Sequence, residues 1–411
     1  MIAAITKEKK INPLAEKVSV TLKNFTGWLE KYGEVSWDHQ SFYSGMYGKF
    51  AKRLYYTAKL PGIVAVAPMV FCEAYLPGAR RLFHHPIRLP IADAHYAMGF
   101  AFLHEATGEA VYLDQAVHFL EALKKTRCPD YKEYCWGYPF DWVTRFATYK
   151  RGTPLITTTP YVFEAFLQVK KLRDSEDSKE ILESIVRHAC TDIKDFKYSD
   201  HGNTCSYTPF DDGKIINASA YRAAMLVTAA KVLGQPQLLE IASLNVNFVL
   251  ETQKPDGSWP YAVDGTRDFV DHFHTCFVMK ALAKIHQCTG DQRIHDALDK
   301  GLDYYLKNLF GEDGMPRPFS KAPRRTVYKC ELYDCAEAVN LCLLLRKDFP
   351  ELEKTMVTVI NGILDNWVKS NGSFRSRKLA SGWDNVPMHR WAQSQMFRAL
   401  SFYLREVNSR L

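Results

Sequence analysis

One structural unit recurs six times along this chain. Each copy is an amphipathic helix, then a turn rich in glycine, proline and aromatic residues, then a second helix that opens with small, hydroxyl and histidine residues. A single helical hairpin cannot bury its own apolar face, so such units stack on their neighbours. The second helices begin near six positions, 65, 60, 53, 59 and 59 residues apart: Ile91, Ile156, Ile216, Phe269, Tyr328 and Pro387. Six hairpins fit a closed ring, so we predict an all-α (α/α)6 toroid whose mouth lies where the second helices start.

The first sixty residues do not follow the repeat. They contain an amphipathic helix over Val18–Lys31 and an aromatic segment, Trp37–Tyr43, that leads into another helix. We therefore predict two parts, an N-terminal helical arm (1–60) packed on the ring and the toroid itself (61–411). The outer helices are predicted from apolar residues at three- and four-residue spacing. They cover Tyr112–Lys125, Ser178–Lys194, Gln237–Thr252, Ile294–Leu309 and Leu352–Lys369.

Composition restricts the class of partner. The net charge is only +7, and no Lys/Arg-rich run of the kind that binds nucleic acid is present. Aromatic residues make up 13% of the chain. A mildly basic and aromatic protein suits an anionic small molecule or glycan better than a nucleic acid duplex. We expect an anionic polysaccharide or oligosaccharide as the partner, and no nucleic acid.

Cysteine usage and the apolar segments indicate the compartment. The ten cysteines are scattered and form no CxxC pair, which is typical of a reducing environment. The N-terminus is too polar for a signal peptide. The longest apolar stretch, Gly62–Tyr75, is too short to span a bilayer, which takes about 20 residues. We predict a buried helix there, with a membrane-surface dock as the alternative, and a soluble, cytoplasmic protein.

The sharpest local signal is Gln253-Lys254-Pro255-Asp256-Gly257-Ser258-Trp259, in which a helix ends, a turn follows and a tryptophan returns to the helix. It resembles the Gln-Trp motif of squalene- and terpenoid-cyclase toroids. In those families the motif joins outer helices, so the resemblance supports the fold and implies nothing about substrate. Trp259 is nevertheless kept among the candidate binding residues.

An aromatic turn, Tyr134–Trp142, precedes the second helix of the next unit. Asp141 lies between Phe140 and Trp142, where desolvation would raise its pKa as a general acid requires. Sugars stack on aromatic rings while polar groups fix their hydroxyls. The alternative is that the aromatic residues plug the ring and that Asp141 caps a helix.

The segment Arg267–Phe277 places two carboxylates and two imidazoles at the start of an inner helix. His272 or His274 could act as a general base near neutral pH. Asp271 lies three residues before His274, on the same side of a helix, and could orient it. The segment also resembles the zinc-binding stretch of protein prenyltransferase β-subunits. That resemblance implies a zinc site from His274 with Cys330 or Cys335, but the accompanying Asp-x-Cys pair is missing.

The remaining candidates come from polar and basic residues near the other turns. Guanidinium groups pair with carboxylates or phosphates, so arginine-rich turns favour an anion-binding mouth over a merely solvated rim. The candidate catalytic residues are Asp93, Tyr138, Asp141, Asp271, His272, His274 and Glu331. The candidate substrate-binding residues are His95, Trp136, Trp142, Arg145, Tyr207, Asn217, Arg222, Trp259, Arg324, Arg325, Trp383, Arg390 and Trp391. We expect no metal and no cofactor.

Five segments together resemble a family of bacterial toroid proteins that are encoded with capsule and exopolysaccharide biosynthesis genes. The resemblance covers nearly the whole chain and implies a pathway rather than a reaction. The toroid is also similar, at the level of the fold, to (α/α)6 glycosidases, polysaccharide lyases and glucuronyl C5-epimerases. The five segments are Pro90–His95, Cys135–Trp142, Pro154–Tyr161, Asp256–Tyr261 and Asp271–Phe277.

Two classes of function follow. The first is an enzyme of polysaccharide assembly or modification. It would abstract a proton beside a uronate carboxylate (epimerase or lyase), or hydrolyse a glycosidic bond with Asp141 and either Glu331 or Asp93. The second is a non-catalytic glycan-binding or scaffold protein, in peripheral contact with a membrane polysaccharide-synthesis complex. A zinc-dependent, prenyltransferase-like toroid is a further alternative.

Overall fold

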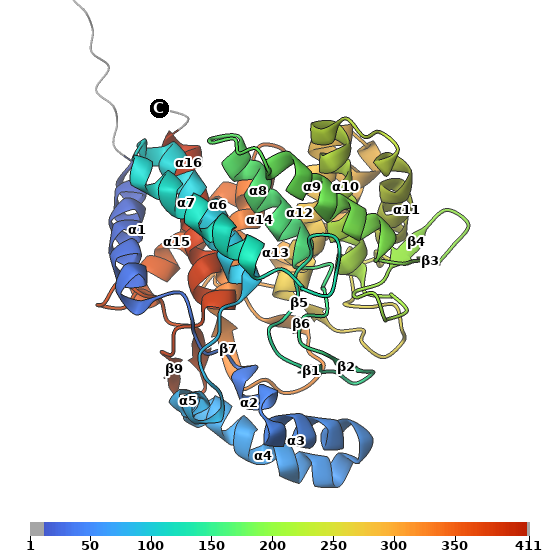
Figure 1. The fold of residues 1–411 in the computed structure, drawn as a ribbon. Helices are drawn as coiled ribbons and strands as arrows, with labels where there is room; N and C mark the ends of the chain where they lie inside the picture. The colour runs from blue at the N-terminus through green and yellow to red at the C-terminus, as the bar shows by residue number, and fades with distance from the viewer. Residues whose placement is uncertain (1–11, 409–411) are drawn as a thin grey trace, which may run out of the picture.

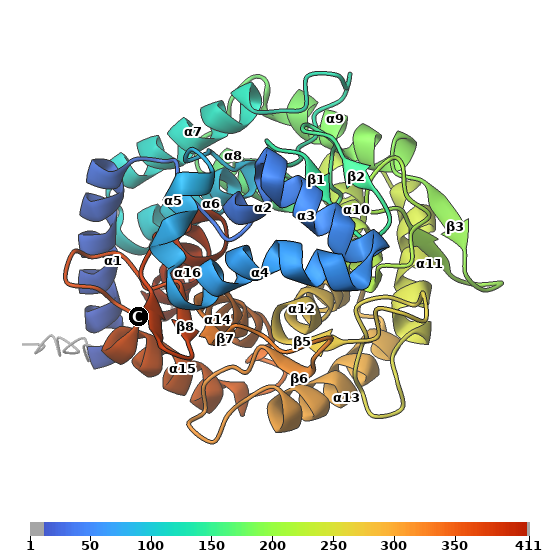
Figure 2. The ribbon, with the colours of Figure 1, turned by 90° about the horizontal axis from the view of Figure 1, so that it is seen from below.

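The computed structural model of the protein describes residues 12–408. Over this range the chain forms a ring of two concentric helical layers, which Figure 2 shows along its axis. The inner helices are α6 (Pro90–Thr107), α8 (Thr159–Lys170), α10 (Ile216–Leu233), α12 (His272–Thr289), α14 (Leu332–Leu345) and α16 (Ser394–Asn408). The outer helices are α1 (Pro13–Tyr32), α7 (Ala110–Lys125), α9 (Ser178–Thr191), α11 (Leu238–Glu251), α13 (Gln292–Asn308) and α15 (Leu352–Asn366). The predicted (α/α)6 toroid is confirmed.

The two layers differ in burial as their sequences predict. Every residue of α6 from Ala92 to Leu103 is buried, because the helix has neighbours on all sides. The outer helix α13 instead buries a single stripe at three- and four-residue spacing, from Ile294 to Tyr305. The apolar core therefore lies between the layers and along the inner wall of the ring.

The first outer helix, α1, takes part in closing the ring. It begins after Asn12, whose side chain caps the backbone N–H groups of Leu14 and Ala15. It packs on α16 and α15, and α16 in turn packs on α6. The buried ring of Phe25 lies 5.2 Å from those of Phe374 and Phe397. Residues 13–32 of the predicted arm thus lie in the outer layer, and residue 60, the predicted boundary, lies near the start of another helix.

A helical hairpin interrupts the ring between α1 and α6. It consists of α2 (Ser41–Ser44), α3 (Met46–Thr57), α4 (Lys59–Tyr75), the 3-10 turn η1 (Pro77–Ala79) and α5 (Arg80–Phe83). We call residues 41–83 the mouth hairpin. It projects from one end of the ring in Figure 1 and lies across that end in Figure 2.

The prediction of a buried helix over Gly62–Tyr75 is wrong about the burial. The segment is helical, but only Gly62 and Met69 of α4 are buried. The reason is that α4 lies outside the ring, where no further layer covers it. Among residues 12–408 no single helix is long and apolar enough to cross a bilayer. The stretch from Lys59 to Phe83 passes by length and composition, but its two parts are bent by 119°.

Short antiparallel strands connect the loops that precede the inner helices. β1 (Trp142–Val143) pairs with β2 (Thr148–Tyr149), and β3 (Asp195–Lys197) pairs with β4 (Asn203–Cys205). The other strands join successive loops around the ring. β5 (Val270–Asp271) pairs with β6 (Phe319–Lys321), and β8 (Arg377–Leu379) lies between β7 (Tyr328–Glu331) and β9 (Gly382–Asp384). These links hold the loops of the mouth against one another.

The Gln253–Trp259 segment joins two outer helices, as its motif predicts. The Gln253 amide donates to the Ala297 carbonyl of α13 at 2.8 Å. The Trp259 indole donates to the Val249 carbonyl of α11 at 2.9 Å. Trp259 is only 3% exposed, so its contacts are structural and it does not face a ligand.

Candidate functional site

Aromatic side chains from successive loops and inner helices meet at the mouth of the ring, the end across which the hairpin lies. They come from the loops before α8, α10 and α12 and from the first turns of α12, α14 and the segment before α16. We call this set the mouth cluster. It consists of Tyr138, Trp142, Tyr207, Tyr261, Phe273, His274, Tyr333, Arg390 and Trp391.

One side of the mouth cluster is a row of stacked rings. Trp391, in the π-helical turn η2 (His389–Gln393), is parallel to Tyr333, with ring centroids 5.9 Å apart and planes at 4°. Tyr333 stacks on Phe273 at 5.0 Å. The His274 ring follows next to Phe273 and meets the Tyr261 ring edge-on at 4.6 Å. Three inner helices are thereby joined by ring contacts.

The other side is formed by the loops before α8 and α10. The Arg390 guanidinium lies 3.9 Å from the Trp391 ring centroid and 4.9 Å from that of Tyr138. Trp142 meets Tyr138 at 5.6 Å and Tyr207 at 6.0 Å. Rings with partly accessible faces, beside a guanidinium, are the surface on which pyranose rings stack. The predicted convergence of these residues at one end of the ring is present.

His274 and Asp271 form a hydrogen-bonded pair at the edge of this cluster. Asp271 is the N-cap of α12, and one carboxylate oxygen accepts from the His274 backbone N–H at 2.9 Å. Its other oxygen lies 2.6 Å from His274 Nδ1. The carboxylate is 2% exposed and the imidazole 22% exposed. This pairing confirms that Asp271 orients His274, and it favours the tautomer in which Nε2 is free to accept a proton.

His274 Nε2 is the chemically available atom of this pair. Among residues 12–408 it has no hydrogen-bond partner, whereas Nδ1 is occupied by Asp271. The imidazole is surrounded by the rings of Tyr261, Phe273 and Phe277. A half-buried base that is fixed by a carboxylate has the geometry of a general acid–base group.

His272 lies elsewhere, although it is only two residues from His274. It is fully buried, with Nε2 2.8 Å from the Tyr305 hydroxyl and Nδ1 3.1 Å from the Leu309 carbonyl. Burial lowers its pKa to about 3. His272 thus connects α12 to the outer helix α13, and its proposed role as a base at the mouth is wrong.

Asp141 is at the mouth, but its electrostatics are the reverse of the prediction. The Arg151 backbone N–H donates to Oδ1 at 3.0 Å, and Lys49 Nζ of the mouth hairpin lies 3.0 Å from Oδ2. The hydrogen bond from the Arg151 backbone, and then Lys49, lower the pKa of Asp141. The predicted raised pKa is wrong because the side chain faces a cation and not the apolar rings beside it. An ionised, paired carboxylate is a poor general acid.

Glu331 begins α14 at the same end of the ring and is buried within an ion-pair network. Arg377 Nε donates to Glu331 at 2.8 Å, and its Nη1 donates to Glu73 of the mouth hairpin at 2.8 Å. Arg377 Nη2 lies 3.0 Å from His39 Nδ1. Burial raises the pKa of Glu331, against the lowering effect of Arg377. Glu331 therefore binds the hairpin to the ring through Arg377.

Asp93 lies in the first turn of α6 and is also fully buried. Arg88 Nε donates to it at 2.8 Å, and Arg88 in turn pairs with Glu34. Burial raises the pKa of Asp93 to about 7, in spite of Arg88. Its partners are residues on the way from α1 to α6, so Asp93 is not joined to the mouth cluster.

A second polar group lies deeper in the ring and was almost entirely missed by sequence reasoning. All six inner helices contribute to what we call the interior network. Its members are His95, Tyr161, Glu164, Tyr221, Lys280, Lys284, Glu337, Gln395 and Arg398. Only His95 was among the predicted site residues.

The interior network is held by short polar contacts. The Tyr161 and Tyr221 hydroxyls are 2.6 Å apart, and Lys280 Nζ, which is ion-paired with Glu337, donates to Tyr161 at 3.2 Å. His95 lies between Gln395, at 2.6 Å, and Arg398, at 3.2 Å. Burial, and then Arg398, lower the pKa of His95, which is therefore neutral near pH 7.

A sequence signal for this network does exist. Lys280 is the one polar residue of Phe277–Leu282, and Glu337 is the one charged residue of Ala336–Leu341. A charge inside a helix that is buried on all sides needs a partner of opposite charge. Two such helices adjacent in the ring would supply each other's partner.

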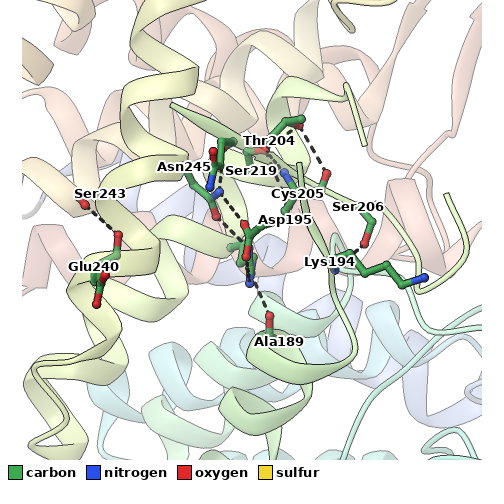
Figure 3. Close-up of polar contacts among 12 residues, drawn as sticks. Ala189, Lys194, Asp195, Thr204, Cys205, Ser206, Ser219, Glu240, Ser243 and Asn245 are labelled. Atoms are coloured by element: carbon green, nitrogen blue, oxygen red, sulfur yellow. Dashed lines mark hydrogen bonds and ion pairs between the residues drawn. The ribbon is translucent and has the colours of Figure 1, made fainter. Parts of the chain in front are cut away.

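Several predicted binding residues are structural. Trp136 is fully buried and donates to the Leu123 carbonyl at 2.9 Å. The Arg222 guanidinium is fully buried between helices and donates to the Ala189 carbonyl at 2.9 Å and to Asp195. Figure 3 shows Asp195, Asn245 and Ala189 grouped by these polar contacts. Asn217 is also buried, within α10.

The other basic and aromatic candidates lie on the surface loops of the mouth. Arg145, Arg324 and Arg325 are exposed. Trp383, on β9, meets Trp367 edge-on at 4.9 Å and carries Arg375 over its ring at 4.7 Å. These residues lie on the loops before α8, α14 and α16 and are not members of the mouth cluster.

Within residues 12–408 no metal-binding group of side chains lies at the mouth cluster, and two cavities lie away from it. Within residues 12–408, no three His, Cys, Asp or Glu side chains are grouped so as to hold a metal ion, so the zinc site weighed for His274 with Cys330 or Cys335 is not assembled. A cavity of about 640 Å³ lies between α11 and α13. Another, of about 540 Å³, lies beside Tyr198 and Tyr304.

Comparison with known proteins gives the class of fold. No protein-family model matches the chain, and no curated protein does. The fold is similar to that of cellobiose 2-epimerase from Bacillus thermoamylovorans B4167, with a TM-score of 0.62 and 11% identity over 79% of this chain and 88% of that one.

Two further solved structures extend the comparison. A D-mannose isomerase has a TM-score of 0.58 and 13% identity, over 78% of this chain and 87% of that one. The GH76A α-1,6-mannanase from Salegentibacter sp. HEL1_6 has a TM-score of 0.55 and 16% identity, over 78% and 89%. The protein therefore has the (α/α)6 toroid fold that these carbohydrate enzymes share.

Proposed function

We propose that this protein is a carbohydrate-active enzyme that moves a proton at a sugar carbon, as an epimerase or isomerase does. The observation that carries the proposal is the Asp271–His274 pair, which presents a free Nε2 among partly exposed aromatic rings. The similar folds support the substrate class, since their names refer to cellobiose, mannose and mannan.

The substrate that fits the mouth best is an anionic glycan of a polysaccharide pathway. The rings of Trp391, Tyr138 and Trp142 offer faces on which sugars stack. Arg390 lies within the cluster, where it is buried and ion-paired with Asp38 at 3.1 Å, and Arg145, Arg324 and Arg325 are exposed on the loops before α8 and α14. These cations would attract a uronate carboxylate. An anionic glycan would therefore bind this mouth more tightly than a mouth without cations.

The chemical step follows from the pair. The C–H bond next to a carbonyl or carboxylate breaks, its proton goes to His274 Nε2, and its electron pair moves to the oxygen as an enolate. Asp271 stabilises the imidazolium that forms. Return of a proton to the opposite face completes an epimerisation, and Tyr138, next to the Arg390 guanidinium, is the group we assign to it.

Glycoside hydrolysis is less well supported. It needs two carboxyl groups, one of them protonated, on either side of the scissile bond. Asp141 is paired with Lys49, Glu331 with Arg377 and Asp93 with Arg88. Burial of Glu331 and Asp93 further keeps these two carboxyl groups from a substrate. Proton transfer through an imidazole needs none of them.

The test is deuterium exchange. The purified protein is incubated in D2O with cellobiose, mannose or glucuronate-containing oligosaccharides, and deuterium at carbon is detected by NMR. His274→Ala should lower the exchange rate by about 10²- to 10⁴-fold, the usual contribution of a general base. Asp271→Asn, which keeps the N-cap, should lower the rate less and shift its pH profile. His201→Ala changes an exposed histidine and should have no effect.

The same variants distinguish the non-catalytic alternative. A scaffold that only binds glycans would incorporate no deuterium from any substrate, and glycan binding by the His274→Ala variant would match that of the unmodified protein. That combination would refute the enzymatic proposal.

A further inference from the structure

The mouth hairpin has an unusual concentration of exposed apolar side chains. Of the 20 large apolar residues that are exposed in the described part of the chain, 12 lie between Met46 and Leu82. Met46, Leu60, Val64 and Leu82 are each more than 70% exposed. The full set is Met46, Tyr47, Phe50, Tyr56, Leu60, Ile63, Val64, Val70, Phe71, Tyr75, Leu76 and Leu82. Exposed apolar side chains gathered on one hairpin in this number mark a protein or membrane contact.

The exposed apolar surface of the hairpin does not result from fraying of its helices. Its two long helices pack on each other around a small core of Phe42, Ala51 and Met69, which is separate from the core of the ring. Buried ion pairs attach its base to the ring, Arg80 to Asp384 and Glu73 to Arg377. The hairpin core and these ion pairs thus fix the outer faces of α3 and α4 away from the ring. No layer of the described chain covers these faces.

The charge of the mouth hairpin indicates which class of partner fits its apolar surface. Residues 41–83 contain six Lys or Arg and one acidic residue, Glu73, a net charge of +5 (6 − 1) out of the +7 of the whole chain. Three of these cations, Arg53, Lys59 and Arg81, are exposed. Basic loops adjoin the hairpin: Arg324 acts on the pKa of Tyr55 and Tyr56, since it lies beside them. Exposed apolar and basic groups on one hairpin are typical of attachment to an anionic bilayer.

We infer that the mouth hairpin docks the protein on the surface of an anionic lipid bilayer. Leu60, Val64 and their neighbours enter the boundary between headgroups and acyl chains, and Arg53, Lys59 and Arg81 contact lipid phosphates. The exposed tyrosines of the hairpin suit the interface, where their hydroxyls stay hydrated. The bend after α4 fits a segment that lies in the membrane surface and does not cross it. A second copy of the chain fits less well, because each hairpin presents the exposed cations Arg53, Lys59 and Arg81 and no exposed carboxylate, so two hairpins repel each other.

Docking has a consequence for the mouth. The hairpin lies across the end of the ring at which the mouth cluster gathers (Figure 2), so the mouth would face the headgroups. If the proposed function holds, this orientation selects a glycan that is carried on a membrane lipid. The docking itself does not depend on that function.

The test is flotation of the full-length protein with extruded vesicles. We expect it to bind vesicles of phosphatidylcholine and phosphatidylglycerol (3:1) and not phosphatidylcholine alone. Leu60→Glu with Val64→Glu should lower binding at least tenfold. Arg53→Ser with Lys59→Ser should lower it by about fivefold for each charge removed, and high salt should do the same. Val232→Glu with Leu239→Glu changes two apolar residues that are each 43% exposed at the opposite end of the ring, and should bind like the unmodified protein.

Two results would overturn the inference. One is equal binding by the Leu60→Glu/Val64→Glu variant and the unmodified protein, with circular dichroism showing both folded. The other is no binding to anionic vesicles together with a dimer, by light scattering, that the same variant abolishes, which would assign the hairpin to self-association. Deuterium exchange with soluble sugars, which tests the proposed function, is measured in a separate experiment. A negative result there would therefore not be confused with either of these two outcomes.

Discussion

At the scale of single residues, His272 and His274 show that two candidates close together in the sequence can face different parts of the structure. Successive residues of an α-helix are about 100° apart, so these two side chains point about 200° apart around α12. His274 faces Tyr261 and the mouth, whereas His272 faces Tyr305 of the outer layer. The sequence places both at the start of an inner helix, but the direction of the ring axis decides which one meets solvent.

Asp93 gives a prediction of pH-dependent stability. Burial raises its pKa in the folded protein to about 7, from about 3.9 in an unfolded chain. Between these values the folded protein keeps a proton that the unfolded chain has lost, so the free energy of unfolding falls as pH rises. This contribution is at most about 1.4 kcal/mol per pH unit. In Asp93→Asn it should disappear, and the variant should gain stability relative to the unmodified protein as pH rises from about 4 to 7.

The measurement is urea unfolding over that pH range. Asp303→Asn provides the control, because this carboxylate is 63% exposed. Stability curves for Asp93→Asn and the unmodified protein that run parallel from pH 4 to 7 would contradict the prediction.

At the scale of elements, the mouth hairpin should behave as a unit that is separable from the ring. Gly62 lies where α4 crosses α3, and a Cβ atom there would meet the Tyr55 backbone. Gly62→Ala should therefore force the two helices apart, and hydrogen exchange over residues 46–75 should become at least about tenfold faster. The main thermal transition should change little, because the hairpin core is separate from that of the ring.

Gly78→Ala serves as the matched substitution, since a Cβ atom at Gly78 meets nothing within 4 Å. It should leave exchange in the hairpin unchanged. A large fall in the main transition temperature of Gly62→Ala would show instead that the hairpin unfolds together with the ring.

At the scale of the whole molecule, stability should depend on closing the ring through α1. Phe25 is fully buried and lies 5.2 Å from the rings of Phe374 and Phe397. Phe25→Ala should lower the free energy of unfolding by about 3–5 kcal/mol, as expected when a buried phenylalanine is truncated. Chemical denaturation measures it, and Val20→Ala, at a 56% exposed position of the same helix, should change it by less than about 0.5 kcal/mol.

A small effect of Phe25→Ala, similar to that of Val20→Ala, would indicate that α1 is an accessory arm, as the division at residue 60 predicts. A large effect would assign residues 13–32 to the ring.

The periodic pattern of the sequence determined the ring. A repeat of helical hairpins has few ways to bury its apolar faces, so the starts of five inner helices and of the five outer helices after α1 could be placed within about four residues. The sixth inner helix, α16, begins seven residues after the predicted Pro387, because the turn η2 precedes it. The Asp271–His274 pair followed from local spacing, because the two residues lie within one turn of helix. The Gln253–Trp259 staple followed from its turn motif, although Gln253 binds Ala297 of the next outer helix.

Only the tertiary structure decided which polar groups share a site. The direction of each side chain relative to the ring axis set His272, Arg222 and Trp136 into the walls, and brought Lys280 and Glu337 together in the interior. The tertiary structure likewise left α4 exposed. An apolar run in the sequence predicts a helix that would be stabilised by burial, but it does not determine whether another part of the fold packs over it. Burial and pairing are properties of neighbours that are distant in the chain, and these neighbours are known only once the ring has closed.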